Sequence, residues 1–341
     1  MIRQGMLGRF GFIAVVASVG ALLTAAGAQA STVTVGSVLP PGSTPTPFEQ
    51  VQTFFNTALP EKGANLTSPV SGAIVRWRVQ GAEGGPFYLR VLRPNGSGGY
   101  MAAGTSNPAT PSGSGLQTFT ANLPVQAGDL IGIDPTNATD KIGVAEAAGA
   151  SYGVIFPPPF DGSTVAPSDA KAGKEIELSA EVQPTPTIIS VAPDFGPVAG
   201  GTTVTITGTD LASASAVKFG SVPATSFKAE SETKITAVAP PSATVGGVDV
   251  TATTIAGTSA TTKDDRFFYE GCVVPKLKGK KLKSAKRMLG RADCKVGKVT
   301  RRKAKPKKAG KVLKQSVKPG KVLASGSKVN LTIGKKAAVS K

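Results

Sequence analysis

The sequence predicts a mostly β protein made of several domains. At 341 residues, the chain is too long for one ordinary hydrophobic core and long enough for two or three domains. Its 41 glycines and 26 prolines supply many turn residues, while aromatic residues make up only 6% of the chain. Valine and threonine alternate in several segments, which is typical of strands that have one face on a core. We therefore expect many short strands joined by turns.

Positive charge is concentrated at the C-terminal end of the chain. The whole sequence has a formal net charge of +18, and residues 272–341 contain 24 Lys and Arg but a single acid, Asp293. The preceding 271 residues contain 15 basic and 20 acidic side chains, so they are net negative. An electrostatic partner is therefore expected to meet the last seventy residues.

The first 30 residues have the pattern of a signal peptide. Arg3 and Arg9 precede an apolar stretch, and the phrase Ala28-Gln29-Ala30 supplies the small residues of a signal peptidase site. Cleavage there would make Ser31 the new N-terminus and predicts a secreted or cell-surface protein. The alternative is an uncleaved N-terminal membrane anchor. No later segment resembles a membrane span, so the mature chain is expected to have none.

Residues 31–183 predict a β-sandwich or jelly-roll domain. Apolar and polar side chains alternate in residues 75–79 and 87–91, which places Val75 in the core and Arg90 on the exposed face. Further strands are expected at residues 117–123, 130–134, 152–156 and 176–182. The phrase at 123–132 resembles a turn and strand of lectin-like β-sandwiches and of exported actinobacterial proteins, and we interpret its Asp129 as a turn residue.

Residues 188–270, after a stiff Pro-rich linker at 184–187, predict a second β domain. Its segments 189–197, 200–211, 217–220, 235–241 and 247–251 resemble the IPT/TIG family of immunoglobulin-like folds. Val204 and Ile206 are expected to be buried, with the flanking threonines facing water. The family includes extracellular spacers and receptors, and also transcription factors that contact DNA. Because this segment has five basic and eight acidic residues, we expect a spacer or interaction module and not a DNA-binding one.

Residues 271–336 predict a small α+β domain, followed by a tail at 337–341. Leu282, Ala285 and Leu289 lie on one face of a predicted helix, and Gly290 is expected to end it. Strands are expected at 297–301, 310–315 and 328–333.

Four phrases in this segment, in a fixed order, resemble the PASTA family. They are Val-Pro-x-Leu-x-Gly at 274–279, Gly-x-Val at 297–299, Gln-x-x-x-Pro-Gly at 315–320 and Gly-Ser-x-Val at 326–329. The resemblance implies one helix against a three-stranded sheet in an extracellular protein. Some members bind fragments of the cell wall and others are spacers.

The two cysteines of the chain, Cys272 and Cys294, flank the predicted helix. In an oxidising compartment two such cysteines most simply form a disulfide, which would clamp the helix to the sheet; the alternative is two buried free thiols.

The residue inventory argues against most enzyme chemistry. The absence of histidine excludes Ser-His and Cys-His nucleophile pairs, and there is no phosphate-binding Gly-x-x-x-x-Gly-Lys phrase. Four acids of the first domain remain candidates for a calcium site or a pair of catalytic carboxylates: Asp129, Asp134, Asp140 and Asp161. The segment from Asp134 to Asp140 is more simply explained as a loop that its own side chains cap and shape. We therefore predict no catalytic residue, no metal site and no cofactor.

The predicted function is that of a non-enzymatic, exported binding protein. Its cationic C-terminal module is expected to associate with peptidoglycan or other anionic polymers of the cell envelope. The alternatives are a carbohydrate-active enzyme or lectin acting through the first domain, and a structural spacer without a dedicated ligand. Because residues 272–341 contain no Phe, Tyr or Trp, we expect no specific nucleic acid partner. The predicted contact residues are Lys298, Arg301, Arg302, Lys303, Lys305, Lys307, Lys308 and Lys311.

Overall fold

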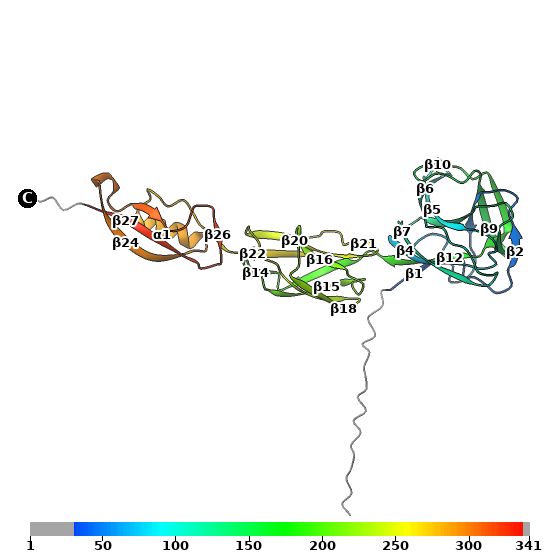
Figure 1. Cartoon of the computed structure of the whole chain (residues 1–341), viewed down its shortest axis with the longest axis horizontal. Coiled ribbons are helices and arrows are strands. Elements are labelled where there is room, and N and C mark those ends of the chain that lie inside the picture. Colours follow the sequence, from blue (N-terminus) through cyan, green and yellow to red (C-terminus); the bar gives the residue numbers. More distant parts are fainter. Residues whose placement is uncertain (1–30, 337–341) are drawn as a thin grey trace, which may run out of the picture.

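The computed structural model describes residues 31–336. The predicted signal peptide, residues 1–30, and the predicted tail, residues 337–341, lie outside this described part. Three folded units follow one another along the long axis of the molecule (Figure 1). We call them the N-terminal domain (31–183), the central domain (188–270) and the C-terminal module (271–336). Each has its own cluster of buried apolar side chains.

The N-terminal domain is a sandwich of two antiparallel sheets. In spatial order, the first sheet contains β1 (Val33–Gly36), β12 (Leu178–Pro184), β4 (Gly72–Val79) and β7 (Gln117–Val125). The second contains β10 (Thr164–Val165), β6 (Tyr100–Thr105), β5 (Phe87–Pro94), β8 (Leu130–Pro135), β3 (Thr53–Ala58), β9 (Lys141–Ile155) and β11 (Asp169–Ile176), and β2 (Thr44–Pro47) also pairs with β9. Side chains of both sheets, among them Trp77, Leu89 and Val182, share one core.

Two side chains of the N-terminal domain break the predicted alternation. Val75 lies at a bulge of β4, where pairing with β7 passes from Ile74 to Arg76, so Ile74 is buried in its place. An extra residue in one strand shifts the alternation of side chains, which explains the wrong prediction for Val75. Arg90, expected to face water, is only 6% exposed. Its guanidinium is buried because it pairs with Asp134, whose carboxylate neutralises the charge.

The central domain is a second β-sandwich. Its first sheet contains β13 (Thr187–Ala192), β15 (Thr203–Thr209), β19 (Lys234–Val238) and β18 (Ser226–Ser231). Its second contains β14 (Phe195–Pro197), β22 (Arg266–Glu270), β20 (Gly246–Thr254), β16 (Ala216–Phe219) and β17 (Val222–Pro223), and β21 (Gly257–Thr258) pairs with β20. Val204 and Ile206 of β15 are fully buried, while Thr203 and Thr207 are exposed and Thr205 between the buried pair is half-buried, so the predicted alternation is confirmed.

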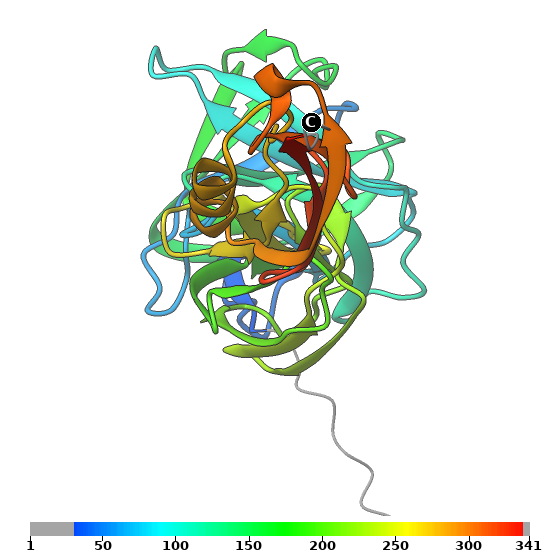
Figure 2. The same cartoon turned by 90° about the vertical axis from the view of Figure 1, so that its left-hand side faces the viewer.

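The C-terminal module packs one helix, α1 (Leu282–Arg291), against a three-stranded sheet of β24 (Lys295–Ala304), β27 (Lys328–Lys336) and β25 (Val312–Gln315). Figure 2, which views the molecule from this end, shows the helix beside the sheet. A short 3-10 turn, η1 (Pro306–Lys308), joins β24 to β25, and a separate two-stranded ladder contains β23 (Cys272–Val273) and β26 (Val322–Leu323). Leu289 of the helix and Leu331 of β27 meet in the core.

The helix of the C-terminal module ends later than the sequence predicted. Gly290 lies inside α1, and the residue with a left-handed backbone is Asp293, at φ 54°. The N–H of Cys294 donates to the carbonyl of Leu289 at 2.9 Å, and the N–H of Asp293 donates to that of Gly290 at 3.3 Å. These two bonds form a Schellman motif, which satisfies the last carbonyl groups of a helix. The prediction failed because Asp takes the position that glycine usually holds.

The predicted disulfide between Cys272 and Cys294 is formed. Cys272 lies in β23, which pairs with β26 and not with the three-stranded sheet. The disulfide therefore joins the end of the helix to the two-stranded ladder, and the expected clamp between helix and main sheet is wrong in this detail.

Short, tightly packed joints connect the three units. Pro184 ends β12 and Thr187 begins β13, so only Thr185 and Pro186 lie between these strands. Near this joint, the hydroxyl of Ser31 donates to Asp210 of the central domain at 2.5 Å. Burial raises the pKa of Glu232 of the central domain and Asp210 adds to the rise, while the backbone N–H of Ser31 opposes it.

The second joint, between the central domain and the C-terminal module, has no linker. Gly271 connects β22 directly to β23, and a Cβ atom there would lie 2.8 Å from the carbonyl oxygen of Leu323 and 3.0 Å from the side chain of Val198. Val322 of the module packs against the core of the central domain.

Within residues 31–336, no helix has the length and apolar character that crossing a membrane requires.

Candidate functional site

A groove in the C-terminal module is lined by five lysines. Its volume is about 590 Å³. Three segments form it: the loop after β23, the end of β24 together with η1, and the start of β25. The lining residues are Lys278, Gly279, Lys303, Ala304, Lys305, Lys308, Lys311, Val312 and Leu313.

Backbone hydrogen bonds hold the three segments of the groove together. The N–H of Gly279 donates to the carbonyl of Val312 at 2.8 Å, which ties the first segment to β25. The N–H of Gly334, in β27, donates to the carbonyl of Lys311 at 3.0 Å. Position 334 requires glycine because a Cβ atom there would lie 2.3 Å from the carbonyl oxygen of Lys308. The lysines of the groove are therefore presented by a fixed backbone.

The positive charge of this groove is not neutralised inside the protein. None of its five lysines forms an ion pair with a carboxylate of residues 31–336. Asp293, the single acid of the module, accepts a hydrogen bond from the hydroxyl of Ser325. Several ammonium groups around one groove repel each other, so an anion placed among them would gain from all of them.

The structure brings together four of the eight predicted contact residues. Lys303, Lys305, Lys308 and Lys311 line the groove, whereas Lys298, Arg301, Arg302 and Lys307 are exposed outside it. Lys278 joins the groove but was not predicted. It lies in the Val-Pro-x-Leu-x-Gly phrase, which identified the fold, and only the long-range bond between Gly279 and Val312 places it near the other lysines.

The basic residues of β24 can also be explained by the position of this strand at the edge of its sheet. In the order β24-β27-β25, β24 has a partner on one side only. Exposed positive charges on an edge strand oppose pairing with a strand of another chain. Lys298, Arg301 and Arg302 can be explained in this way without any ligand.

The carboxylates predicted as calcium or catalytic candidates in the N-terminal domain serve structural contacts. Asp129 is 1% exposed and accepts two hydrogen bonds from Arg93, each at 2.8 Å. Asp134 and Asp161 both contact Arg90. Asp140 accepts backbone N–H groups of Thr136 and Asn137 at 3.0 and 2.9 Å and of Gly85 at 2.8 Å, so it shapes its loop. Among the described residues 31–336, no three acidic or cysteine side chains form a group able to hold a metal ion.

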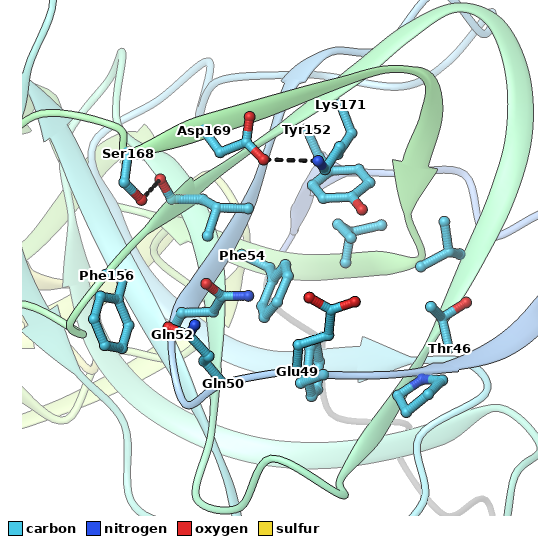
Figure 3. Close-up of a pocket in the computed structure, with 15 residues that line it drawn as sticks. Thr46, Glu49, Gln50, Gln52, Phe54, Tyr152, Phe156, Ser168, Asp169 and Lys171 are labelled. Atoms are coloured by element: carbon cyan, nitrogen blue, oxygen red, sulfur yellow. Dashed lines mark hydrogen bonds and ion pairs between the residues drawn. The ribbon is translucent and has the colours of Figure 1, made fainter.

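A second cavity, which we call the aromatic pocket, lies in the N-terminal domain and was not predicted. It has a volume of about 460 Å³. In Figure 3, the rings of Phe54 and Tyr152 lie between Glu49 on one side and Asp169 and Lys171 on the other. The remaining lining residues are Thr46, Pro47, Phe48, Gln50, Gln52, Val144, Val154, Phe156, Ser168 and Ile176. No sequence signal could have joined them, because they come from four strands and three loops.

Two ionisable groups of the aromatic pocket hold each other in their charged forms. The ammonium of Lys171 lies 2.7 Å from the carboxylate of Asp169. Their hydrogen bond lowers the pKa of Asp169 and raises the pKa of Lys171. Burial raises the pKa of Tyr152, so its phenol stays protonated and can donate a hydrogen bond.

The fold and the lysine groove define a mostly β, multidomain protein that carries a basic α+β module at its C-terminal end. Comparison with protein families gives these units names. Residues 186–269 match the family model of the IPT/TIG domain, and residues 273–335 match that of the PASTA domain. The chain thus contains both domains, as the sequence motifs predicted. Neither domain type is catalytic, and the disulfide and both types are features found in extracellular proteins.

Comparison with whole proteins adds little. No curated protein matches the chain. One similar solved structure is the full extracellular region of plexin A4, with 20% identity and a TM-score of 0.25. The match covers 64% of this chain and 18% of that chain, so this chain spans less than a fifth of its length. At this score, the likeness carries no argument about fold or function.

Proposed function

We propose that the protein is a non-enzymatic, exported binding protein that attaches to anionic polymers of the cell envelope through its PASTA module. The observation that carries the proposal is the groove of five lysines without carboxylate partners among the described residues. The match to the PASTA domain supports a wall polymer as the ligand.

The chemistry of the groove favours an irregular polyanion. Lysine ammonium groups are compact charges on flexible stems, so they do not demand the planar, two-pronged geometry that arginine selects. All five charged lining residues are lysine. Carboxylates of peptide stems and phosphates of wall polymers both meet this requirement. A single-stranded nucleic acid would leave its bases unstacked, because residues 272–341 contain no aromatic side chain.

Sedimentation with purified cell walls tests the proposal. The groove variant replaces Lys278, Lys303, Lys305 and Lys308 by Gln. The control variant removes the same charge from the exposed face of α1 by replacing Lys283, Lys286, Arg287 and Arg291 by Gln. If each surface contact contributes roughly 0.4 kcal/mol, the groove variant should bind about tenfold more weakly than the control.

A salt series and a comparison of extracted cell walls test whether binding is electrostatic and which polymer is bound. Binding of the unaltered protein should fall as salt is raised from about 0.05 to 0.5 M, because salt screens exposed charges. Walls from which the anionic polymers have been extracted should lose binding if those polymers are the ligand, and retain it if the peptide stems are. Equal binding by the groove and control variants would show that general charge, and not the groove, is responsible, and the proposal would be wrong.

A further inference from the structure

The aromatic pocket lies against the edge of the core of the N-terminal domain. Its floor contains Phe54, Val154 and Ile176, which also belong to the main core cluster between the two sheets. These residues lie on β3, β9 and β11, at one end of the eight-stranded sheet. The four-stranded sheet contributes no residue to the lining. Phe54, Val154 and Ile176 are themselves buried, whereas Phe156 and the charged side chains of the lining are exposed.

The rim of the pocket offers hydrogen-bonding groups that the protein itself does not use. The side chains of Glu49, Gln50 and Gln52 make no hydrogen bond to another residue within 31–336, and neither does the phenol of Tyr152. Opposite Glu49, Gln50 and Gln52, Asp169 and Lys171 pair with each other (Figure 3). The pocket thus combines an aromatic floor with free amide, carboxylate and hydroxyl groups.

We propose that the aromatic pocket binds a neutral saccharide. A pyranose ring has an apolar C–H face that packs on aromatic side chains, and hydroxyl groups around its edge that both donate and accept hydrogen bonds. Amides and a carboxylate at the rim match those hydroxyls, and the volume of about 460 Å³ lies in the usual range for small-molecule pockets. A purely apolar ligand would leave the rim groups without partners.

Charge selects neutral sugars over acidic ones. The ionisable lining residues, apart from Tyr152, are Glu49, Asp169 and Lys171, which leave a net negative charge. An anionic ligand would be repelled, in contrast to the lysine groove at the other end of the molecule. The two sites therefore take ligands of different classes, and this inference goes beyond the function proposed for the PASTA module.

The arrangement supports binding and not hydrolysis. Glycoside hydrolysis usually requires two carboxyl groups, one of which donates a proton. Asp169 is held ionised by Lys171 and accepts the N–H of Ala170 at 2.8 Å, so it is a poor proton donor. Glu49 is then left without a second catalytic carboxyl in the pocket.

Titration of the protein with a panel of trisaccharides tests the proposal. The probes are maltotriose, cellotriose, mannotriose and N-acetylchitotriose, with trigalacturonate as the acidic comparison. Binding is measured by saturation-transfer difference NMR and by calorimetry. At least one neutral probe should bind saturably and more tightly than trigalacturonate.

Two exposed phenylalanines provide a matched pair of variants. Phe156 lines the pocket and is 54% exposed, whereas Phe160 is 86% exposed and lies outside the lining, so neither substitution removes a core side chain. Phe156→Ala should weaken binding of the neutral probe about fivefold or more, because one aromatic face is lost, while Phe160→Ala should leave it unchanged. Glu49→Gln should keep hydrogen bonding and reduce the discrimination against trigalacturonate.

The outcomes separate this proposal from that of the PASTA module. The proposal is wrong if no neutral probe binds up to its solubility limit, if trigalacturonate binds as tightly, or if Phe156→Ala and Phe160→Ala behave alike. The groove variant of the PASTA module should bind the neutral probe like the unaltered protein, so failure of one site leaves the test of the other intact.

Discussion

Buried carboxyl groups in the N-terminal domain show how a single residue can oppose stability. Glu175 is fully buried, and burial raises its pKa to about 7, a rise that the hydrogen bond from Ser37 opposes and the adjacent Glu61 and Glu177 increase. Burial also raises the pKa of Glu177. A carboxyl whose folded pKa exceeds its unfolded pKa favours folding only at low pH. This part of the stability is complete below about pH 4.5 and is lost as the pH rises through about 7.

Glu175→Gln should therefore stabilise the N-terminal domain at high pH. The amide keeps the size of the side chain and can donate to Glu61, but it cannot acquire a charge. We expect a gain of roughly 1 to 3 kcal/mol at pH 9 and little change at pH 4.5. The single tryptophan, Trp77, is buried in this domain, so its fluorescence during urea denaturation reports this domain alone. The control is Glu146→Gln, at a side chain that is 78% exposed. Equal effects of the two substitutions at pH 9 would contradict this account.

Residues also show where prediction from sequence reaches its limit. The alternation around Val204 and the pairing of Cys272 with Cys294 follow from local pattern and composition, and the structure agrees with both. Arg90 was placed on the wrong side because its partner Asp134 lies 44 residues away. Lys278 was missed for the same reason, since it reaches the groove only through pairing of distant segments.

At the scale of elements, helix α1 carries a residue that its structure does not require. Gly290 lies inside the helix without a positive φ, and a Cβ atom there would meet no atom within 4 Å. Glycine in a helix costs conformational entropy relative to alanine. From the sequence, Gly290 was predicted to end the helix, whereas the residue with the left-handed backbone that follows the helix is Asp293.

Gly290→Ala should stabilise the helix by about 0.5 to 1 kcal/mol. Hydrogen exchange of the amides in α1, followed by mass spectrometry, measures this local free energy. Amides of the central domain in the same sample serve as the internal control and should exchange at unchanged rates. Faster exchange in the helix would mean that position 290 needs the freedom of glycine.

The arrangement of strands and loops also explains why neither the lysine groove nor the aromatic pocket could be predicted in full. Four of the five groove lysines were predicted because they lie within nine residues of sequence, 303–311, in a run of charge. The aromatic pocket combines residues from β2, β3, β9 and β11, separated by more than 120 positions. These strands come together only in the folded eight-stranded sheet, and no local sequence pattern records their pairing.

Across the whole molecule, the two proposed sites lie in units at opposite ends of the long axis (Figure 1). The central domain separates them, and short joints connect it to each neighbour. The second joint depends on Gly271, because any larger residue would press on Leu323 and Val198. This packing predicts that the central domain and the PASTA module move together.

Gly271→Ala should loosen this second joint. The added Cβ atom would lie 3.0 Å from the side chain of Val198 in the central domain and 2.8 Å from the carbonyl of Leu323 in the module, so the PASTA module must shift relative to the central domain. Small-angle X-ray scattering should show a broader distribution of distances, while the free energy of unfolding of the N-terminal domain stays unchanged. Gly113→Ala, where a Cβ atom meets nothing within 4 Å, is the control. A scattering profile identical to that of the control would show that the joint tolerates the methyl group.

The contact of Ser31 with Asp210 and Glu232 gives the predicted leader cleavage a physical consequence. In the precursor, the nitrogen of Ser31 is a neutral peptide amide. Removal of residues 1–30 would convert it into an ammonium ion beside two carboxylates, one of them poorly hydrated. Cleavage by the signal peptidase would thereby create a new ion pair between the N-terminal and central domains. The joint between these two domains would then become stiffer only after export.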